Sequence, residues 1–214
     1  EMQRSLVGSE MCIRDRGKRV DLKELTEGLL RAGYTRCEQV EGVGQFALRG
    51  GILDVFSPLM DQPVRCEFFD DEIDSMGAFD PGTQRRTRNL DTALILPAAE
   101  VLPHAAPGGL TGLAETLEAL AEKLSKKQKA EAQVRTLRED AARLRGGSIP
   151  GGMDRYLAAV YKEVAAGVHY LPPDAVVFLS ECGRVDERVK NTLLQLKQDA
   201  EALLTAGLLA GEYA

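Results

Sequence analysis

The stretch that decides the fold of this chain is Gly44-Gln-Phe-Ala-Leu-Arg-Gly-Gly-Ile-Leu-Asp-Val-Phe56. Two short runs with alternating side chains flank the pair Gly50-Gly51, which is a strong turn signal. Because successive side chains of a strand point to opposite faces, Phe46 and Leu48 should point inward, and Ala47 and Arg49 outward. The stretch therefore predicts two neighbouring strands joined by a tight turn.

The period of two continues on both sides of this stretch. The strands that we expect are residues 35–40, 45–49, 52–57, 64–69, 72–79 and 88–96. Short strands with tight connections favour an antiparallel meander. A helix should precede them over residues 21–32, because its leucines have helical spacing and Gly33 follows its end.

The character of the chain changes after Pro97. A linker rich in Pro and Gly over residues 103–109 leads into a helical pattern over residues 110–144. The pattern has two apolar stripes, formed by Leu113, Leu117, Leu120 and Leu124 and by Val134, Leu137, Ala141 and Leu144. Residues 125–133 between them are polar all round. The helix either continues through them, to a length of roughly 50 Å, or bends there.

Three more elements follow. We expect a helix over residues 154–166 and another over about 186–209. Between them the run Ala175-Val-Val-Phe-Leu179 is apolar throughout, as in a strand buried on both faces. Such a strand needs neighbours, and none is near in the sequence. The expected fold class is therefore α+β: a small antiparallel β-rich domain at 17–98, then a mainly helical region at 99–214 with one buried strand from an incomplete α/β domain.

Composition limits the classes of function. The chain of 214 residues is 44% hydrophobic and 28% charged, as in an ordinary soluble globular protein. Its net charge of −6 argues against strong autonomous binding of nucleic acid, and no apolar run approaches the roughly 18 residues that cross a bilayer. The scattered cysteines Cys12, Cys37, Cys66 and Cys182 disfavour a zinc site and are typical of a reduced, cytoplasmic protein.

The first part of the chain fits neither a signal peptide nor a packed element. The run Ser5-Leu-Val-Gly-Ser-Glu-Met-Cys-Ile-Arg-Asp-Arg16 resembles translated sequencing-adapter sequence joined to a gene fragment. We expect residues 1–16 to be non-native and unstructured, and to contribute nothing to a core.

The strand over residues 64–69 carries the candidate binding residues. Alternation places Val64, Cys66 and Phe68 on one face, and Arg65, Glu67 and Phe69 on the other. Arginines beside an exposed aromatic ring are typical of a protein interface, because Arg pairs with carboxylates and Phe fills a pocket. The alternative is structural: Arg65 pairs with Glu67 or a cross-strand acid, and Phe69 covers a loop.

Two patterns that could indicate chemistry are incomplete. The acidic run Asp70-Asp-Glu-Ile-Asp74 lacks the Gly and the final Glu of a calcium loop, because Ser75 and Pro81 occupy those positions. No G-x-x-x-x-G-K-[ST] motif occurs, so the cradle for nucleotide phosphates is missing. We expect no catalytic residue, no cofactor and no metal in this chain.

Several motifs resemble the bacterial transcription-repair-coupling factors. They are Gly33-Tyr34, the stretch 44–56 quoted above, Val64-Arg-Cys-Glu-Phe-Phe-Asp-Asp-Glu-Ile-Asp-Ser75, Phe79-Asp80, Thr83-Gln-Arg85 and Leu96-Pro-Ala98. The resemblance runs from about Val20 to Leu102 and returns at residues 170–179. The same segments are more distantly similar to the excision-repair helicase subunit UvrB.

The resemblance implies that the β-rich segment is a UvrA-binding domain, with Arg49, Arg65 and Phe69 as its contacts to UvrA. It also implies that the chain is a fragment of a protein that displaces stalled RNA polymerase by ATP-driven translocation on DNA. The motor that uses ATP and Mg, and the contacts to RNA polymerase and DNA, would lie outside this chain. Ser180 replaces the Asp of an Asp-Glu pair at the end of a metal-binding strand in the UvrB-like pattern, which implies a degenerate nucleotide site.

Two alternatives stay open on the sequence. One is a fragment of an active UvrB-type helicase subunit, which would need an upstream phosphate loop and which Ser180 disfavours. The other is a nucleic-acid-binding module, which the acidic charge disfavours.

Overall fold

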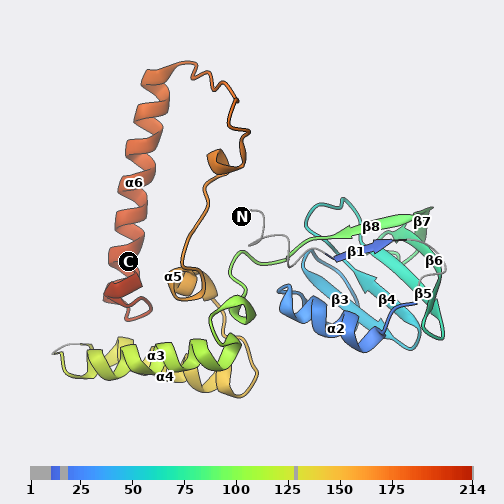
Figure 1. Ribbon diagram of the computed structural model, residues 1–214, viewed down its shortest axis with the longest axis horizontal. Coiled ribbons are helices and arrows are strands. Elements are labelled where there is room, and N and C mark those ends of the chain that lie inside the picture. Colours follow the sequence, from blue (N-terminus) through green and yellow to red (C-terminus); the bar gives the residue numbers. More distant parts are fainter. Residues whose placement is uncertain (1–10, 15–18, 128–129, 214) are drawn as a thin grey trace. The chain divides into compact units, whose positions relative to one another are not determined.

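The computed structural model describes residues 11–14, 19–127 and 130–213 and divides the chain into two compact units, Glu1–Leu102 and Pro103–Ala214 (Figure 1). The sequence placed this division after Ala98. Residues 99–102 instead pack on the first unit, where they lie against Gly33, which has φ +85°. A side chain at this position would prevent the contact, since an added Cβ would lie 2.8 Å from the Cβ of Ala99 and 3.2 Å from Leu102 Cδ2. Gly33 thus serves both the helix end and this close approach.

Helix α2 (Leu22–Arg31) matches the predicted helix. Its start is fixed by Asp21, whose carboxylate accepts the backbone N–H groups of Lys23 at 2.7 Å and Glu24 at 3.2 Å. This cap satisfies donors that the first turn of a helix otherwise leaves open. The buried side chains of Leu25 and Leu29 attach the helix to the sheet of the first unit.

That sheet has the strand order β2-β3-β4-β5-β6-β7. The strands are β2 (Thr35–Arg36), β3 (Gln45–Arg49), β4 (Ile52–Val55), β5 (Val64–Phe69), β6 (Glu72–Phe79) and β7 (Arg86–Asn89). All neighbours are antiparallel except β2 and β3. The predicted meander is therefore confirmed for β3 to β7 and wrong at β2. The chain loops back between the two strands, and the Thr35 N–H donates to the Gly44 carbonyl at 2.9 Å, so that β2 runs parallel to β3.

The single strand predicted at 88–96 is two strands. After β7 the Leu90 N–H donates to the Met76 carbonyl, and the chain then leaves this sheet as β8 (Thr92–Ile95). Strand β8 pairs antiparallel with β1 (Met11–Arg14), with Met11 opposite Ile95.

Strand β1 corrects one expectation. Residues 1–16 were expected to be unstructured, yet Met11–Arg14 pair along the whole of β8 and satisfy backbone groups that would otherwise form an open edge. Residues 1–10, 15 and 16 lie outside the described part of the chain.

The main core of the first unit lies between α2 and one face of the sheet (Figure 1). It contains Leu25, Leu29, Ala32, Tyr34, Phe46, Leu53, Val55, Val64, Cys66, Ile73, Met76, Ala93 and Ile95. Opposite Glu67 and Phe68 the register of β6 skips one residue. This bulge lets both Ile73 and Met76 face the core, although they are an odd number of residues apart. The alternation predicted for Phe46 and for the 64–69 strand is confirmed.

In the second unit, α3 (Gly109–Ser125) and α4 (Glu131–Arg145) pack side by side (Figure 1). The two predicted apolar stripes are buried: Leu113, Leu117, Leu120 and Leu124 in α3, and Val134, Leu137, Ala141 and Leu144 in α4. The sequence left open whether residues 110–144 form one continuous helix or bend within the polar stretch 125–133. The structure has two separate helices. The chain reverses within the polar stretch because each stripe needs an apolar partner, and the other stripe provides it.

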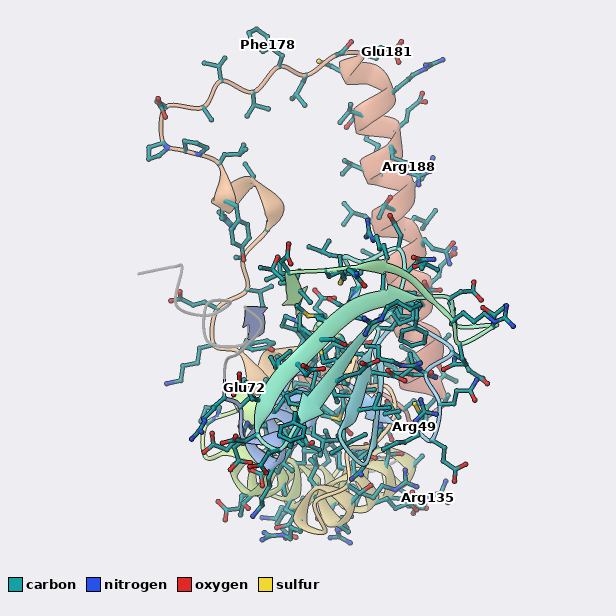
Figure 2. All side chains as sticks on the ribbon, turned by 90° about the vertical axis from the view of Figure 1, so that its right-hand side faces the viewer. Arg49, Glu72, Arg135, Phe178, Glu181 and Arg188 are labelled. Carbon is teal, nitrogen blue, oxygen red and sulfur yellow. The ribbon has the colours of Figure 1, made fainter. Side chains whose placement is uncertain are left out.

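Two predicted elements of this unit are wrong. In place of a helix over 154–166 there is a 3₁₀ helix, Met153–Tyr156, and a single turn, α5 (Leu157–Val160), since Val160 is buried but Val164 is 59% exposed. In place of a buried strand at 175–179, the chain is extended and exposed, and Phe178 is 89% exposed (Figure 2). No strand lies beside it among the described residues, so nothing covers either face.

The remaining elements are short 3₁₀ helices at Pro103–Ala105, Gly167–Tyr170 and Gly211–Tyr213 and the long helix α6 (Cys182–Thr205). Helix α6 confirms the predicted last helix, although it begins and ends a few residues earlier. At its end, Gln133 Nε2 and Thr136 Oγ1 of α4 donate to the carbonyls of Leu204 and Gly207. Among the described helices, none combines the length and the apolar character of a membrane span.

A buried carboxylate joins α4 to the segment that follows it. Asp140 is 5% exposed and accepts from the Arg155 guanidinium and from the Tyr156 hydroxyl, the latter at 2.6 Å. Burial raises the pKa of Tyr156, so this hydroxyl remains a donor. The Tyr156 ring in turn meets the edge of Tyr213, with 5.8 Å between the ring centroids.

Replacing this carboxylate should destabilise the second unit. Asp140→Ala leaves the Arg155 guanidinium and the Tyr156 hydroxyl without their acceptor, and we expect the free energy of unfolding to fall by about 1–3 kcal/mol. Denaturant titration followed by circular dichroism measures this. The matched control is Asp186→Ala, which removes an exposed pair with Lys190 on α6 and should have little effect. Equal stability of the two variants would contradict the role given to Asp140.

Thiol labelling tests the core of the first unit. Burial raises the pKa of Cys66 to about 12, and burial also raises the pKa of the half-buried Cys37. Because the thiolate is the reactive form, a raised pKa slows labelling at mildly alkaline pH. We expect a disulfide reagent to label the exposed Cys182 first, Cys37 more slowly, and Cys66 only in denaturant. Peptide mass spectrometry assigns the sites, and rapid native labelling of Cys66 would contradict the fold.

Candidate functional site

The candidate site lies on the face of the sheet that α2 does not cover. We call it the recognition face and define it by Arg49, Asp54, Arg65, Glu67 and Phe69. The strand register places four of these side chains in two rows, and Phe69 lies beyond them at the end of β5, opposite Glu72. In one row Ala47, Asp54, Arg65 and Gly77 lie opposite one another across β3 to β6, and in the next row Arg49, Ile52, Glu67 and Ser75 do the same.

Two tight turns hold the ends of this face. Strands β3 and β4 are joined by Gly50-Gly51, with φ +58° at Gly50, and β5 and β6 by Asp70-Asp71, with φ +59° at Asp70. The two hairpin ends are neighbours, because the Phe68 N–H donates to the Gly51 carbonyl at 2.7 Å. Arg49 (Figure 2) and Phe69 therefore stand at the same end of the sheet, each just before a turn.

The carboxylate of Asp54 lies at the centre of the recognition face and has no exposed surface. Arg65 binds it with two parallel hydrogen bonds, from Nε to Oδ1 at 2.7 Å and from Nη2 to Oδ2 at 2.8 Å. Arg49 donates from Nη2 to Oδ2 at 2.7 Å. A buried carboxylate needs such partners, because an unpaired charge away from water is very costly.

Arg65 is held on its other sides as well. It donates from Nη1 to the Gln84 carbonyl at 3.2 Å and from Nη2 to Gln84 Oε1 at 3.0 Å. Its guanidinium also lies over the Phe79 ring, 4.4 Å from the centroid. The hydrogen bonds to Asp54 raise the pKa of Arg65 above its already high value, so the group stays charged.

A second polar cluster occupies the neighbouring row. Arg86 reaches across from β7 and binds Glu67 Oε1 at 3.1 Å and Ser75 Oγ at 2.8 Å, and Ser75 donates to Glu67 Oε2 at 2.6 Å. Its path crosses Gly77, where an added Cβ would lie 2.9 Å from Arg86 Nε and 2.7 Å from the Arg88 carbonyl. The absence of a side chain at Gly77 therefore allows Arg86 to reach Glu67.

The structure distinguishes the three predicted contact residues. The Phe69 side chain is 81% exposed, so it does not cover a loop. The Arg49 side chain is 45% exposed, whereas that of Arg65 is only 17% exposed and pairs with a cross-strand acid, as the structural alternative proposed. Arg49 and Phe69 are accessible to a partner, and Arg65 lies mostly beneath the surface.

The sequence interpretation missed two features of this face. Ala47 was expected to face water and is fully buried, because it packs in a second small core with Val40 and Phe79. Asp54 was not singled out, although an acid within the apolar run Ile52-Leu-Asp-Val-Phe56 was a visible signal. Its partner could not be identified without the strand register.

The described residues contain no cluster of three or more His, Cys, Asp or Glu side chains arranged to hold a metal ion. Asp70 and Asp71 form the β5–β6 turn, and the Asp71 carboxylate pairs with Arg19. Ser180 is exposed where the chain enters α6, and the Glu181 carboxylate beside it pairs with Arg184.

The chain is similar to known proteins over most of its length. Residues 14–101 match the family model described as the UvrB interaction domain. The chain is 28% identical over 198 residues to the transcription-repair-coupling factor of Bacillus subtilis (strain 168), covering 92% of this chain and 16% of that protein. It is 29% identical over 205 residues to the transcription-repair-coupling factor of Staphylococcus haemolyticus (strain JCSC1435), and this match covers 89% of this chain and 16% of that protein. It is 50% identical over 86 residues to the transcription-repair-coupling factor of Myxococcus xanthus, and this match covers 40% of this chain and 7% of that protein.

The chain thus spans only a small part of the length of these relatives. The 50% identical match to the Myxococcus xanthus factor covers a smaller share of this chain than the 28% and 29% identical matches do. Residues 14–101 of this chain match the UvrB interaction domain family, and over most of its length the chain is similar to the transcription-repair-coupling factors.

Proposed function

We propose that this chain recruits UvrA through the recognition face of its first unit. The observation that carries the proposal is the position of Phe69. A phenylalanine that is 81% exposed at the end of a strand, at the same end of the sheet as the half-exposed Arg49, has no role in the core of this unit. Exposed aromatic and arginine side chains are the residues that most often dominate protein interfaces.

The charges of the face support a protein partner. Two guanidinium groups surround one carboxylate at Asp54, which leaves one net positive charge in this cluster, while the nearby Glu67 is paired with Arg86. Such a cluster would attract a carboxylate, and Phe69 would occupy an apolar pocket next to it. Its small positive charge, in a chain whose net charge is −6, disfavours nucleic acid as the main ligand.

The wider role is also proposed. The relatives are named transcription-repair-coupling factors, and we propose that the whole protein displaces stalled RNA polymerase by ATP-driven translocation on DNA. The segment described here would contribute recruitment without nucleotide chemistry of its own. Ser180 supports this division of labour, because a neutral hydroxyl in place of a carboxylate lacks the negative charge that attracts Mg²⁺.

Binding to purified UvrA tests the proposal. We expect Phe69→Ala and Arg49→Ala each to weaken the affinity at least about fivefold, or roughly 1 kcal/mol. The matched controls are Leu59→Ala, an apolar residue that is 68% exposed in the β4–β5 connection, and Arg31→Ala, an exposed arginine on α2. Calorimetry or surface plasmon resonance measures the affinities.

The controls decide what a loss of binding means. Both control variants should bind UvrA as the unchanged chain does, since they remove the same kinds of side chain away from the recognition face. Full affinity in a folded chain that carries both Phe69→Ala and Arg49→Ala would refute the proposal.

A further inference from the structure

Arg49 and Arg65 share one carboxylate but differ in what they leave for a partner. Of the five N–H groups of a guanidinium, Arg65 uses four within this unit: Nε and both N–H groups of Nη2 on Asp54 and Gln84, and one of Nη1 on the Gln84 carbonyl. One of its faces is covered by the Phe79 ring. Arg65 therefore has little left with which to bind a second protein.

The donors of Arg49 are used differently. Its Nη2 donates to Asp54 Oδ2 at 2.7 Å, and nearly half of its side chain is exposed. The bond is made to the same oxygen that Arg65 Nη2 binds at 2.8 Å. Because Arg65 donates hydrogen bonds to both oxygens of Asp54, it fixes the plane of the carboxylate. The position at which Oδ2 accepts from Arg49 is thereby fixed as well.

This arrangement has an energetic consequence for binding. A free arginine at the end of a strand samples many rotamers and loses that freedom when a partner holds it. A hydrogen bond to a buried, immobile acceptor removes much of this freedom before the partner arrives. The remaining N–H groups of Arg49, whose side chain is nearly half exposed, then sample fewer orientations before the partner binds.

We propose that Asp54 and Arg65 are positioning residues, and that Arg49 is the arginine that contacts the partner, through a carboxylate on the partner's surface. Phe69 contributes the apolar contact independently of this pair. The inference deepens the proposed function and rests on it, since it concerns how the same recognition face binds UvrA. It changes the part played by Arg65 from a contact to a support.

A double-mutant cycle with UvrA as the probe tests the inference. We expect Arg49→Ala to weaken the affinity about tenfold and Asp54→Asn to weaken it severalfold. The double variant that carries both substitutions should bind UvrA no more than about twofold more weakly than Arg49→Ala alone, because Asp54 acts through Arg49. Losses that multiply in the double variant would overturn the proposal.

Two further measurements separate positioning from a merely structural effect. Asp54→Asn combined with Phe69→Ala should show losses that multiply, since Phe69 acts independently; a general loosening of the sheet would make these two losses overlap instead and would contradict the proposal. Raised ionic strength should weaken the unchanged chain more than Arg49→Ala, because the contact joins two charges. An equal dependence would contradict a carboxylate partner.

Folding is checked separately. Circular dichroism and native labelling of Cys66 report whether each variant keeps its core. If Asp54→Asn unfolds, Arg65→Lys replaces it in the cycle: it keeps the positive charge and loses the paired hydrogen bonds. We expect Arg65→Lys to weaken binding when Arg49 is present and to have no further effect beside Arg49→Ala, whereas multiplying losses overturn the proposal.

The design also distinguishes this inference from the proposed function. Normal UvrA affinity after Arg49→Ala and Phe69→Ala would refute recruitment through this face and the positioning with it. Weakened affinity in both single variants, together with multiplying losses in the Asp54 and Arg65 cycles, would keep the proposed function and refute the positioning alone.

Discussion

The Asp54 carboxylate has no exposed surface, and it can remain charged there because Arg49 and Arg65 donate three hydrogen bonds to it. Asp54 lies directly opposite Arg65 in the ladder between β4 and β5. A slip of one residue in that ladder would turn Arg65 toward the core and Cys66 toward the acid. The ion pair therefore selects one register and determines which side chains reach the recognition face.

The rest of the first unit builds on that register. With Leu53, Val55, Val64 and Cys66 on the opposite face, α2 has an apolar surface on which Leu25 and Leu29 pack. The bulge in β6 returns Ile73 and Met76 to the same side. The sheet is thus packed against α2 on one face. On the other face it presents Arg49 and Phe69, on two adjacent hairpins whose backbones are joined by a hydrogen bond. Rigid placement of this kind lowers the cost of ordering side chains on binding.

Local patterns were enough to predict most of the sheet, because alternation and turn residues act over a few positions. Helix α2, strands β3 to β6 and the exposure of Phe69 followed from them. The burial of Ala47 did not, since Val40 and Phe79 cover it from other parts of the chain. The run 175–179 shows the same limit: its apolar composition predicts burial, yet no described strand lies beside it, and it is exposed. The resemblance pointed to Arg65 as a contact, but only the three-dimensional structure showed that its donors bind Asp54 and Gln84.

The most direct test of the account is hydrogen–deuterium exchange of this chain with and without UvrA. We expect slower exchange on binding in the peptides that contain the Gly50-Gly51 and Asp70-Asp71 turns, and unchanged exchange in α2 on the other side of the sheet. Protection that appears in α2 or in the second unit while both turns exchange as before would show that UvrA binds elsewhere and would contradict the assignment of the recognition face.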